Sequence, residues 1–365
     1  MSLGKRVKDT VLLVAKLGIA VALLGWLVHS GKLEPDKIWA AVSTNPLWLG
    51  FALMLYNVCI VLTANRWRML LVSQGIPTPR RDCVVMTYIG CFFSCFLPGG
   101  TGGDFVKAYY VARDSHKRAE AATTVFLDRV LGLYCMVGLA AVAILFRIGH
   151  LWHYGVGEGA KPVLLGLTRT QLLTVGVLTG FCAATIGFII FLSSHCRRLV
   201  HWLLGHLPHR LGGILKRVYE SVYLYRGHKR LLAKFALYSV SAHGLAAVVL
   251  CIVGLSLHDP VASGGTRALN YFFLIPLGLV LNGLPLAPAG VGVFEWALGF
   301  LFATVLVAGE SNVGPNVAAL GHVIIILTNL IGLIFYLKGK RRVTEAIEQA
   351  QHDGDAPLPD PNADA

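Results

Sequence analysis

Leu97-Pro98-Gly99-Gly100-Thr101-Gly102-Gly103-Asp104 interrupts a part of the chain that is otherwise apolar. In the second half of the chain, Ala287-Pro288-Ala289-Gly290-Val291-Gly292-Val293-Phe294-Glu295 interrupts a similar part. Both stretches contain Pro-x-Gly-x-Gly followed by an acidic residue, and we call them the first break and the second break. Apolar segments that are broken at corresponding places in two halves of a chain are typical of a transporter-type binding site.

The composition predicts an integral membrane protein. Of 365 residues, 55% are hydrophobic and 14% are charged, and the mean hydropathy is +0.65, which is too apolar for a soluble surface. Most of the apolar stretches approach the roughly 20 residues that a helix needs to cross hydrocarbon. They are residues 10–30, 47–64, 83–97, 121–146, 171–193, 235–257, 268–286, 291–308 and 317–337. We therefore expect an all-α, polytopic fold.

The basic residues predict how the chain is oriented in the membrane. The formal net charge is +13, but the Lys and Arg residues lie in short loops that alternate with the apolar stretches, so we predict no nucleic-acid partner. Of the 32 Lys and Arg residues, 24 lie in the segments 1–9, 65–82, 105–120, 195–234 and 338–342. We assign these segments and both termini to the cytoplasmic side of the cell (inner) membrane.

This assignment predicts that each break belongs to a hairpin. Residues 83–110 must begin and end on the cytoplasmic side, and the 15 residues of the first limb cover only about 22 Å of a roughly 30 Å hydrocarbon core. We expect a re-entrant hairpin there. Residues 268–308 begin and end on the outer side, and their limbs are long enough for two full crossings. A re-entrant hairpin and a pair of crossings both return the chain to the side that it left, so the orientation of the later spans is the same in either case.

Each half then contains two spans, a hairpin and a third span, over about residues 10–146 and 171–337. Because three crossings is an odd number, the second half is inverted relative to the first, a layout expected for alternating access. We expect one transmembrane domain over residues 1–342 and a disordered tail over residues 343–365, where the end of the chain is acidic and rich in proline. The sequence contains no feature that indicates the oligomeric state.

Two further motifs complete a recognisable set: Ala64-Asn65-Arg66-Trp67-Arg68-Met69-Leu70-Leu71 and Leu127-Asp128-Arg129-Val130-Leu131-Gly132-Leu133. Together with the two breaks, they resemble the flippase-like transmembrane region of lysylphosphatidylglycerol synthases and the stand-alone, uncharacterised membrane proteins built from that region. The resemblance covers nearly all of residues 12–337. Ala289 stands where many relatives carry glycine.

The resemblance implies a role in lipid transport. Members of the family are linked to the movement of aminoacylated phospholipids, and related proteins to pathways for polyprenyl-phosphate sugars or hopanoids. The chain ends soon after its last span, without room for a soluble aminoacyl-transfer domain. The resemblance therefore implies the transport half without the synthase half.

The glycines of the breaks have two interpretations, which the sequence leaves open. Gly99, Gly100, Gly102 and Gly103 permit positive φ, so their N–H groups would converge at the start of the next helix and bind an anion such as a lipid phosphate. Alternatively, they only allow a tight turn. Gly290 and Gly292 are the corresponding glycines of the second break.

Charged residues near the first break predict ion pairs. Asp104 is either an N-cap or part of a binding site, and Lys107, three residues later, would offset its charge. Asp128 and Arg129 lie inside a span, where ionisable groups are costly and are usually paired. Adjacent helical residues point about 100° apart. We therefore expect Arg129 to meet Asp104 or a lipid headgroup, and Asp128 to meet a partner such as Arg66; a purely structural network is the alternative.

Glu295 is the counterpart of Asp104, and its possible roles are an N-cap, a proton carrier or a contact for a cationic headgroup. Other polar residues inside spans are more typical of interhelical hydrogen bonds than of a site. These are His243, Asn282, His322 and Asn329.

Residues 195–234 interleave Leu, Trp and Tyr with nine basic residues, which predicts amphipathic helices on an anionic inner leaflet. The histidines of this segment have no metal-ligand spacing, and we predict no metal site.

The leading hypothesis is a flippase or transporter of a lipid or lipid-linked substrate that carries a phosphate. Membrane phospholipids and polyprenyl-phosphate-linked lipids are the expected partners. A membrane-embedded transferase, with Asp104, Asp128 and Glu295 as catalytic or metal-binding carboxylates, and a non-transporting scaffold of a lipid-synthesis complex are the alternatives. No P-loop, His-Glu-x-x-His or nucleotide-binding glycine motif supports an enzyme, and we expect no cofactor.

Overall fold

The structure is a computed structural model, and it describes most of the chain from residue 34 to residue 354. The described residues are 25, 29, 34–96, 102–115, 118–154, 164, 167–191, 193–206, 216, 219–220, 222–223, 225–257, 264–283, 290–305 and 313–354. All regular secondary structure in this part is helical, apart from one isolated bridge between Leu164 and Leu167. The predicted all-α class is confirmed.

The helices up to residue 154 include both limbs of the first break. They are α2 (Pro35–Thr44), α3 (Pro46–Ser73), α4 (Arg80–Phe96), α5 (Gly102–Ser115) and α6 (Arg118–Tyr154). Proline stands at the first position of both α2 and α3, where its missing N–H costs no hydrogen bond. The predicted span over residues 10–30 lies outside the described residues, apart from Gly25 and His29.

The later helices include both limbs of the second break. They are α7 (Arg169–Phe191), α8 (Ser194–Gly205), η1 (Tyr225–Gly227), α10 (Lys229–Ser256), α11 (Gly264–Asn282), α12 (Val293–Val305) and α13 (Val313–Gly354). The last helix continues into the segment for which the sequence predicts a disordered tail, and residues 355–365 lie outside the described residues.

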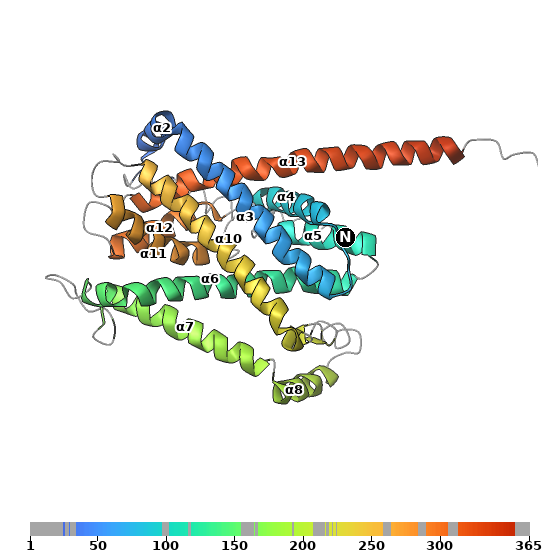
Figure 1. The fold of residues 1–365 in the computed structure, drawn as a ribbon, viewed down its shortest axis with the longest axis horizontal. Coiled ribbons are helices and arrows are strands. Elements are labelled where there is room, and N and C mark those ends of the chain that lie inside the picture. The colour runs from blue at the N-terminus through green and yellow to red at the C-terminus, as the bar shows by residue number, and fades with distance from the viewer. Residues whose placement is uncertain are drawn as a thin grey trace, which may run out of the picture.

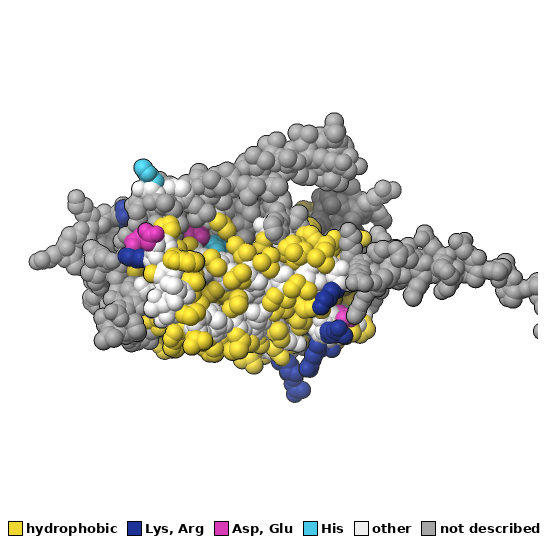
Figure 2. Space-filling view, turned by 90° about the horizontal axis from the view of Figure 1, so that it is seen from above, with side chains coloured by type: hydrophobic (Ala, Val, Ile, Leu, Met, Phe, Trp, Pro, Cys, Tyr) yellow, Lys and Arg dark blue, Asp and Glu magenta, His cyan; other side chains and the backbone are white. Residues whose placement is uncertain are grey.

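Five of these helices are long and apolar enough to cross a membrane: α3, α6, α7, α10 and α13. Large hydrophobic side chains are exposed on them, for example Leu47, Phe146 and Ile189. Figure 2 shows a broad band of hydrophobic side chains with the charged side chains mostly toward its ends. Such a surface is suited to lipid, and the chain is a multi-pass membrane protein.

The two halves of the chain interlock. Helices α3 and α10 pack side by side and run diagonally through the middle of the molecule (Figure 1). Helix α4 packs against its hairpin partner α5 and against α13 of the other half, and α11 packs against its partner α12 and against α6. The pair α4 and α5 and the pair α11 and α12 lie toward opposite ends of the long axis (Figure 1).

The largest buried cluster surrounds the second break. It contains the aromatic side chains Tyr271, Phe294 and Phe302, which are fully buried, together with Leu298 and Leu250. A smaller cluster around Trp67 holds α3 against α4, α5 and α6. The residues that follow each break are therefore placed by buried packing.

Candidate functional site

The first break ends in a close contact between α4 and α5. Gly99, Gly100 and Thr101 lie outside the described residues, and α5 begins at Gly102. The N–H of Gly103 donates to Ser94 Oγ at 3.2 Å, and Gly103 lies so close to the carbonyl of Gly90 that a Cβ would overlap it. Gly103 therefore has a packing role, as the turn interpretation requires, and the predicted binding of an anion stays a prediction.

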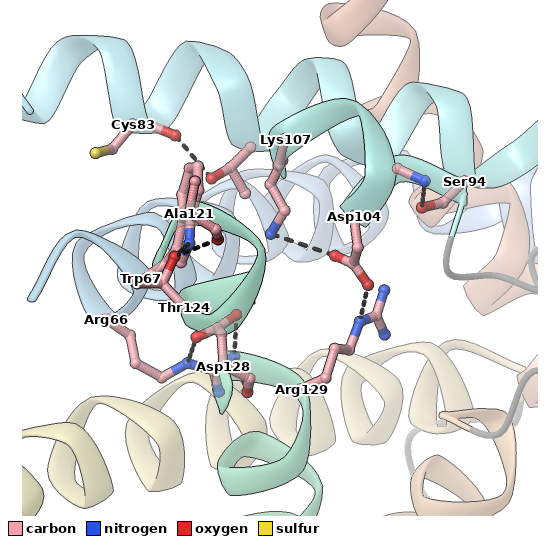
Figure 3. Close-up of polar contacts among 12 residues, drawn as sticks. Arg66, Trp67, Cys83, Ser94, Asp104, Lys107, Ala121, Thr124, Asp128 and Arg129 are labelled. Carbon is pink, nitrogen blue, oxygen red and sulfur yellow. Dashed lines mark hydrogen bonds and ion pairs between the residues drawn. The ribbon is translucent and has the colours of Figure 1, made fainter. Parts of the chain in front are cut away.

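Asp104 is the third residue of α5, so the N-cap interpretation is wrong for this residue. Its Oδ2 accepts from Arg129 Nε on α6, and its Oδ1 lies 3.5 Å from Lys107 Nζ (Figure 3). Both predicted pairings of Asp104 are confirmed. The Asp104 and Lys107 side chains are buried, whereas the Arg129 side chain is 45% exposed.

Arg66 and Asp128 form a second, fully buried ion pair. Arg66 donates from Nε to Asp128 Oδ1 at 2.8 Å and from Nη2 to Oδ2 at 3.0 Å, and the two side chains are 6% and 5% exposed. The predicted pairing is confirmed, and its bidentate geometry is the strongest that these groups form.

The surroundings of this pair tie three helices together. Arg66 Nη1 donates to Ser239 Oγ on α10 at 3.2 Å, and its guanidinium lies 5.1 Å from the centre of the Phe235 ring. A Cβ on Gly132 of α6 would lie 2.8 Å from Arg66 Nη1, so glycine leaves the room that the guanidinium needs. The pair joins α3, α6 and α10, which favours a structural role for it.

Trp67 lies beside Thr124 of α6 (Figure 3). Its Nε1 donates to Thr124 Oγ1 at 3.3 Å, and Lys107 Nζ lies 4.9 Å from the centre of its ring. Sequence reasoning did not assign Trp67 or Thr124 to the site, although Trp67 directly follows Arg66 in one of the motifs. The two sets of ion pairs come from neighbouring positions of α3, α5 and α6, and we call Arg66, Asp104, Lys107, Asp128 and Arg129 the first cluster.

The second break has its own cluster. Gly290 and Gly292 have φ of 76° and 83°, a conformation that favours glycine, and a Cβ on Gly290 would overlap Asn282 Oδ1. Glu295 is the third residue of α12, so it is not the N-cap. Its Oε2 accepts from the N–H of Gly292 at 2.7 Å, the reverse half of a capping box.

The other oxygen of Glu295 meets a histidine. Glu295 Oε1 and His322 Nδ1 on α13 are 2.7 Å apart, and the two side chains are 2% and 4% exposed. The sequence indicated only an interhelical hydrogen bond for His322, and spacing alone could not identify its partner. We call Gly290, Gly292, Glu295 and His322 the second cluster.

The basic segment after α7 is held by an exposed ion pair. Glu220 accepts from Arg197 Nε and Nη2, both at 3.0 Å, and lies 2.5 Å from His201 Nε2. Partial burial raises the pKa of Glu220, but the contacts with His201 and Arg197 outweigh it and hold that pKa below its ordinary value. Trp202 and Leu203 of α8 are exposed. No three His, Cys, Asp or Glu side chains are grouped as a metal site in the described part of the chain.

Comparison with known proteins adds to this geometry. The family model described as the lysylphosphatidylglycerol synthase TM region matches residues 13–337, which include every span and both breaks. The chain belongs to this family. The resemblance that the motifs indicated is therefore confirmed.

Two curated proteins are similar to this chain at low sequence identity. The glycosyltransferase AglD of Haloferax volcanii is 24% identical over 87% of this chain and 52% of its own length, so the chain spans about half of that protein. A UPF0104 membrane protein of Methanothermobacter thermautotrophicus is 22% identical over 91% of this chain and 94% of its own length. No solved structure matches.

Proposed function

We propose that the protein is a flippase that moves a phosphate-bearing lipid or lipid-linked substrate between leaflets. One observation carries the proposal. In each half, the acidic residue at the third position of the helix after the break contacts a basic residue on the following long helix: Asp104 with Arg129, and Glu295 with His322. Two breaks with equivalent contacts between an acidic and a basic side chain suit a site that opens alternately to either side.

The packing of the helices supports two related halves. Among the eight helices α3–α6 and α10–α13, exchanging α3 with α10, α4 with α11, α5 with α12 and α6 with α13 leaves the set of packed pairs unchanged: α4 on α13 becomes α11 on α6, and α5 on α6 becomes α12 on α13. With three crossings in each half, such a repeat is inverted, and its two hairpins enter from opposite faces. The basic loops and both termini are then cytoplasmic.

The charge of the first cluster supports a phosphate as cargo. Arg66 and Asp128 neutralise one another, whereas Asp104 is shared by Lys107 and Arg129, which leaves one positive charge in excess. The partly exposed guanidinium of Arg129 is the group that a lipid phosphate would reach. On the same reasoning, the exposed Trp202 and Leu203 of α8 and the basic residues of 195–234 rest on an anionic inner leaflet.

Reconstitution into liposomes tests the proposal. Vesicles would contain phosphatidylglycerol, aminoacylated phosphatidylglycerol or a polyprenyl-phosphate sugar with a reporter on the headgroup, and an impermeant quencher would measure exchange between leaflets. We expect faster exchange for at least one lipid and at least a tenfold loss in Arg129→Gln. Arg197→Gln, which removes an exposed guanidinium, is the control. Unchanged exchange for every lipid with correctly folded protein would overturn the proposal.

The similarity to a glycosyltransferase favours a second candidate, a membrane-embedded transferase that acts on a polyprenyl-phosphate or phospholipid carrier. The same liposomes test it when they are supplied with activated sugars and the lipids are analysed by mass spectrometry. A glycosylated lipid that forms only with active protein would favour the transferase over the flippase.

A further inference from the structure

The Glu295 and His322 pair is an acid and a base enclosed in the most apolar part of the molecule. Phe294, Leu298 and Phe302 are fully buried beside it, and the Phe294 and His322 rings meet edge to face at 5.5 Å. Ionisable groups at such depth are costly and usually serve a pathway or a pair. Glu295 and His322 form such a pair, and the chemistry of histidine indicates a pathway as well.

The equivalent pair of the first half differs in one property. Arg129 keeps its charge at every pH that proteins meet, so the pair with Asp104 is permanent. The equivalent place in the second half holds His322. Imidazole is the side chain that most readily accepts and releases a proton near neutral pH. Of the two equivalent pairs, the second is the one that contains an imidazole.

The second pair is also linked to the backbone of the break. Glu295 contacts His322 through one oxygen and the N–H of Gly292 through the other, so a single carboxylate holds both the turn and α13. Gly292 has a positive φ and begins the turn into α12. A change in the charge of the pair therefore acts directly on the hairpin that the proposed transport cycle moves.

We infer that the Glu295 and His322 pair carries a proton, so that movement of the lipid is coupled to movement of a proton. This inference rests on the proposed function. A proton from one aqueous side binds the imidazole of His322, and the imidazolium neutralises the Glu295 carboxylate. Release of the same proton to the other side restores the neutral imidazole. Only bonds to hydrogen form and break.

Other ionisable groups on the helices that pack against α12 and α13 are thiols, phenols and charged groups. Within the described residues they include Asp36 and Lys37 on α2, Tyr56, Cys59, Arg66 and Arg68 on α3, Arg80, Arg81, Asp82, Cys83, Tyr88, Cys91 and Cys95 on α4, Arg169 and Cys182 on α7, Lys229, Arg230, Lys234, Tyr238, His243 and Cys251 on α10, and Tyr271 on α11. Thiols and phenols are ordinarily neutral near pH 7. His243 is a second imidazole in this set, and it provides the matched control.

Liposomes with a pH gradient test the coupling. For one proton per lipid, a gradient of about one pH unit supports up to about a tenfold asymmetry of the reporter lipid between leaflets. We expect an asymmetry that reverses when the gradient is reversed, and a lipid-dependent change in the signal of a pH dye inside the vesicles. Both signals should vanish in Glu295→Gln and His322→Gln and persist in His243→Gln. Their loss in His243→Gln but not in His322→Gln would overturn the assignment.

Two failures are distinguishable. If lipid exchange is the same with the pH gradient in either direction, the coupling to protons is overturned, whereas the proposed flippase function is still supported. If no lipid exchanges at all, the proposed function fails, and amide hydrogen exchange of residues 290–296 decides the proton site by itself. After correction for intrinsic rates, protection should change between about pH 5 and 8 in the wild type and be flat in His322→Gln. Equal pH dependence in both proteins would overturn the inference, because a purely structural histidine lowers protection equally at every pH.

Discussion

Asp104 and Glu295 occupy the same position in their helices, the third residue after each break, and each contacts a base on the next long helix. The two carboxylates nevertheless have different neighbours. Asp104 is shared between Lys107 and Arg129, whereas Glu295 is held by a backbone N–H and an imidazole. The same position therefore meets two permanent cations in one half and an imidazole in the other.

Charge reversal tests the pair between Asp104 and Arg129. Asp104→Arg places a third cation beside Lys107 and Arg129, and we expect lipid exchange in liposomes to fall at least tenfold, or about 1.4 kcal/mol. Arg129→Asp should cause a similar loss. The double variant restores opposite charges and should recover most of the exchange. If the double variant is as inactive as the single variants, the pairing does not support activity.

Removal of one partner of the buried Arg66 and Asp128 pair should strongly destabilise the protein. Asp128→Asn leaves the Arg66 charge uncompensated between three helices, and we expect a loss of about 3–5 kcal/mol. The double change Arg66→Met with Asp128→Leu removes both charges and should lower the melting temperature in detergent less than either single change. A double variant that melts below both single variants would contradict this expectation.

Glycine substitutions separate close packing from ordinary helix propensity. Gly103→Ala would place a methyl group against the carbonyl of Gly90 and should destabilise the contact between α4 and α5. Gly180→Ala in α7 meets nothing within 4 Å and should stabilise its helix by about 0.5–1 kcal/mol. Melting temperatures measured in the same detergent compare the two variants. Equal changes would show that the contact at Gly103 is unimportant.

The ion pair of Glu220 predicts a pH dependence at α8. Contacts with His201 and Arg197 lower the pKa of Glu220 in the folded protein. The ionised Glu220 carboxylate therefore stabilises the fold fully at pH values above its pKa in the unfolded chain, which is about 4.3. This stabilisation is lost as the pH falls through the lower pKa that Glu220 has in the folded protein. Amide exchange in α8, corrected for intrinsic rates, should increase as the pH falls below about pH 4. Glu220→Gln should exchange faster throughout, without this transition.

Sequence reasoning was most successful for charged residues inside spans. Asp128 and Arg129 are adjacent, and helix geometry indicated that they would not pair with each other. Of the partners considered for them, the structure has Arg66 with Asp128 and Asp104 with Arg129. Few cations and carboxylates lie at such depth, so the choice of partners was small. The contact of Lys107 with Asp104 followed from their spacing of three residues on one helix.

The partner of Glu295 could not be predicted from the sequence. Several polar residues in the later spans could have met it, and a neutral imidazole carries no charge that marks it as a counterion. The N-cap interpretation also failed for both acidic residues, because each helix begins three residues earlier than that interpretation requires. The start of a helix after a glycine-rich turn depends on backbone dihedrals, and the residue types alone leave these open.

The amino-acid sequence by itself determined that this chain enters a membrane as helices and that two of its apolar segments are broken. Hydropathy and helix length decide both properties, because they describe the transfer of each segment from water to lipid. Only the tertiary structure decided that α4 packs on α13, that α11 packs on α6 and that His322 meets Glu295. Helices in lipid gain no hydrophobic energy from one another, so close fits at glycines and matched polar groups select the neighbours, and these appear only when the chain is folded.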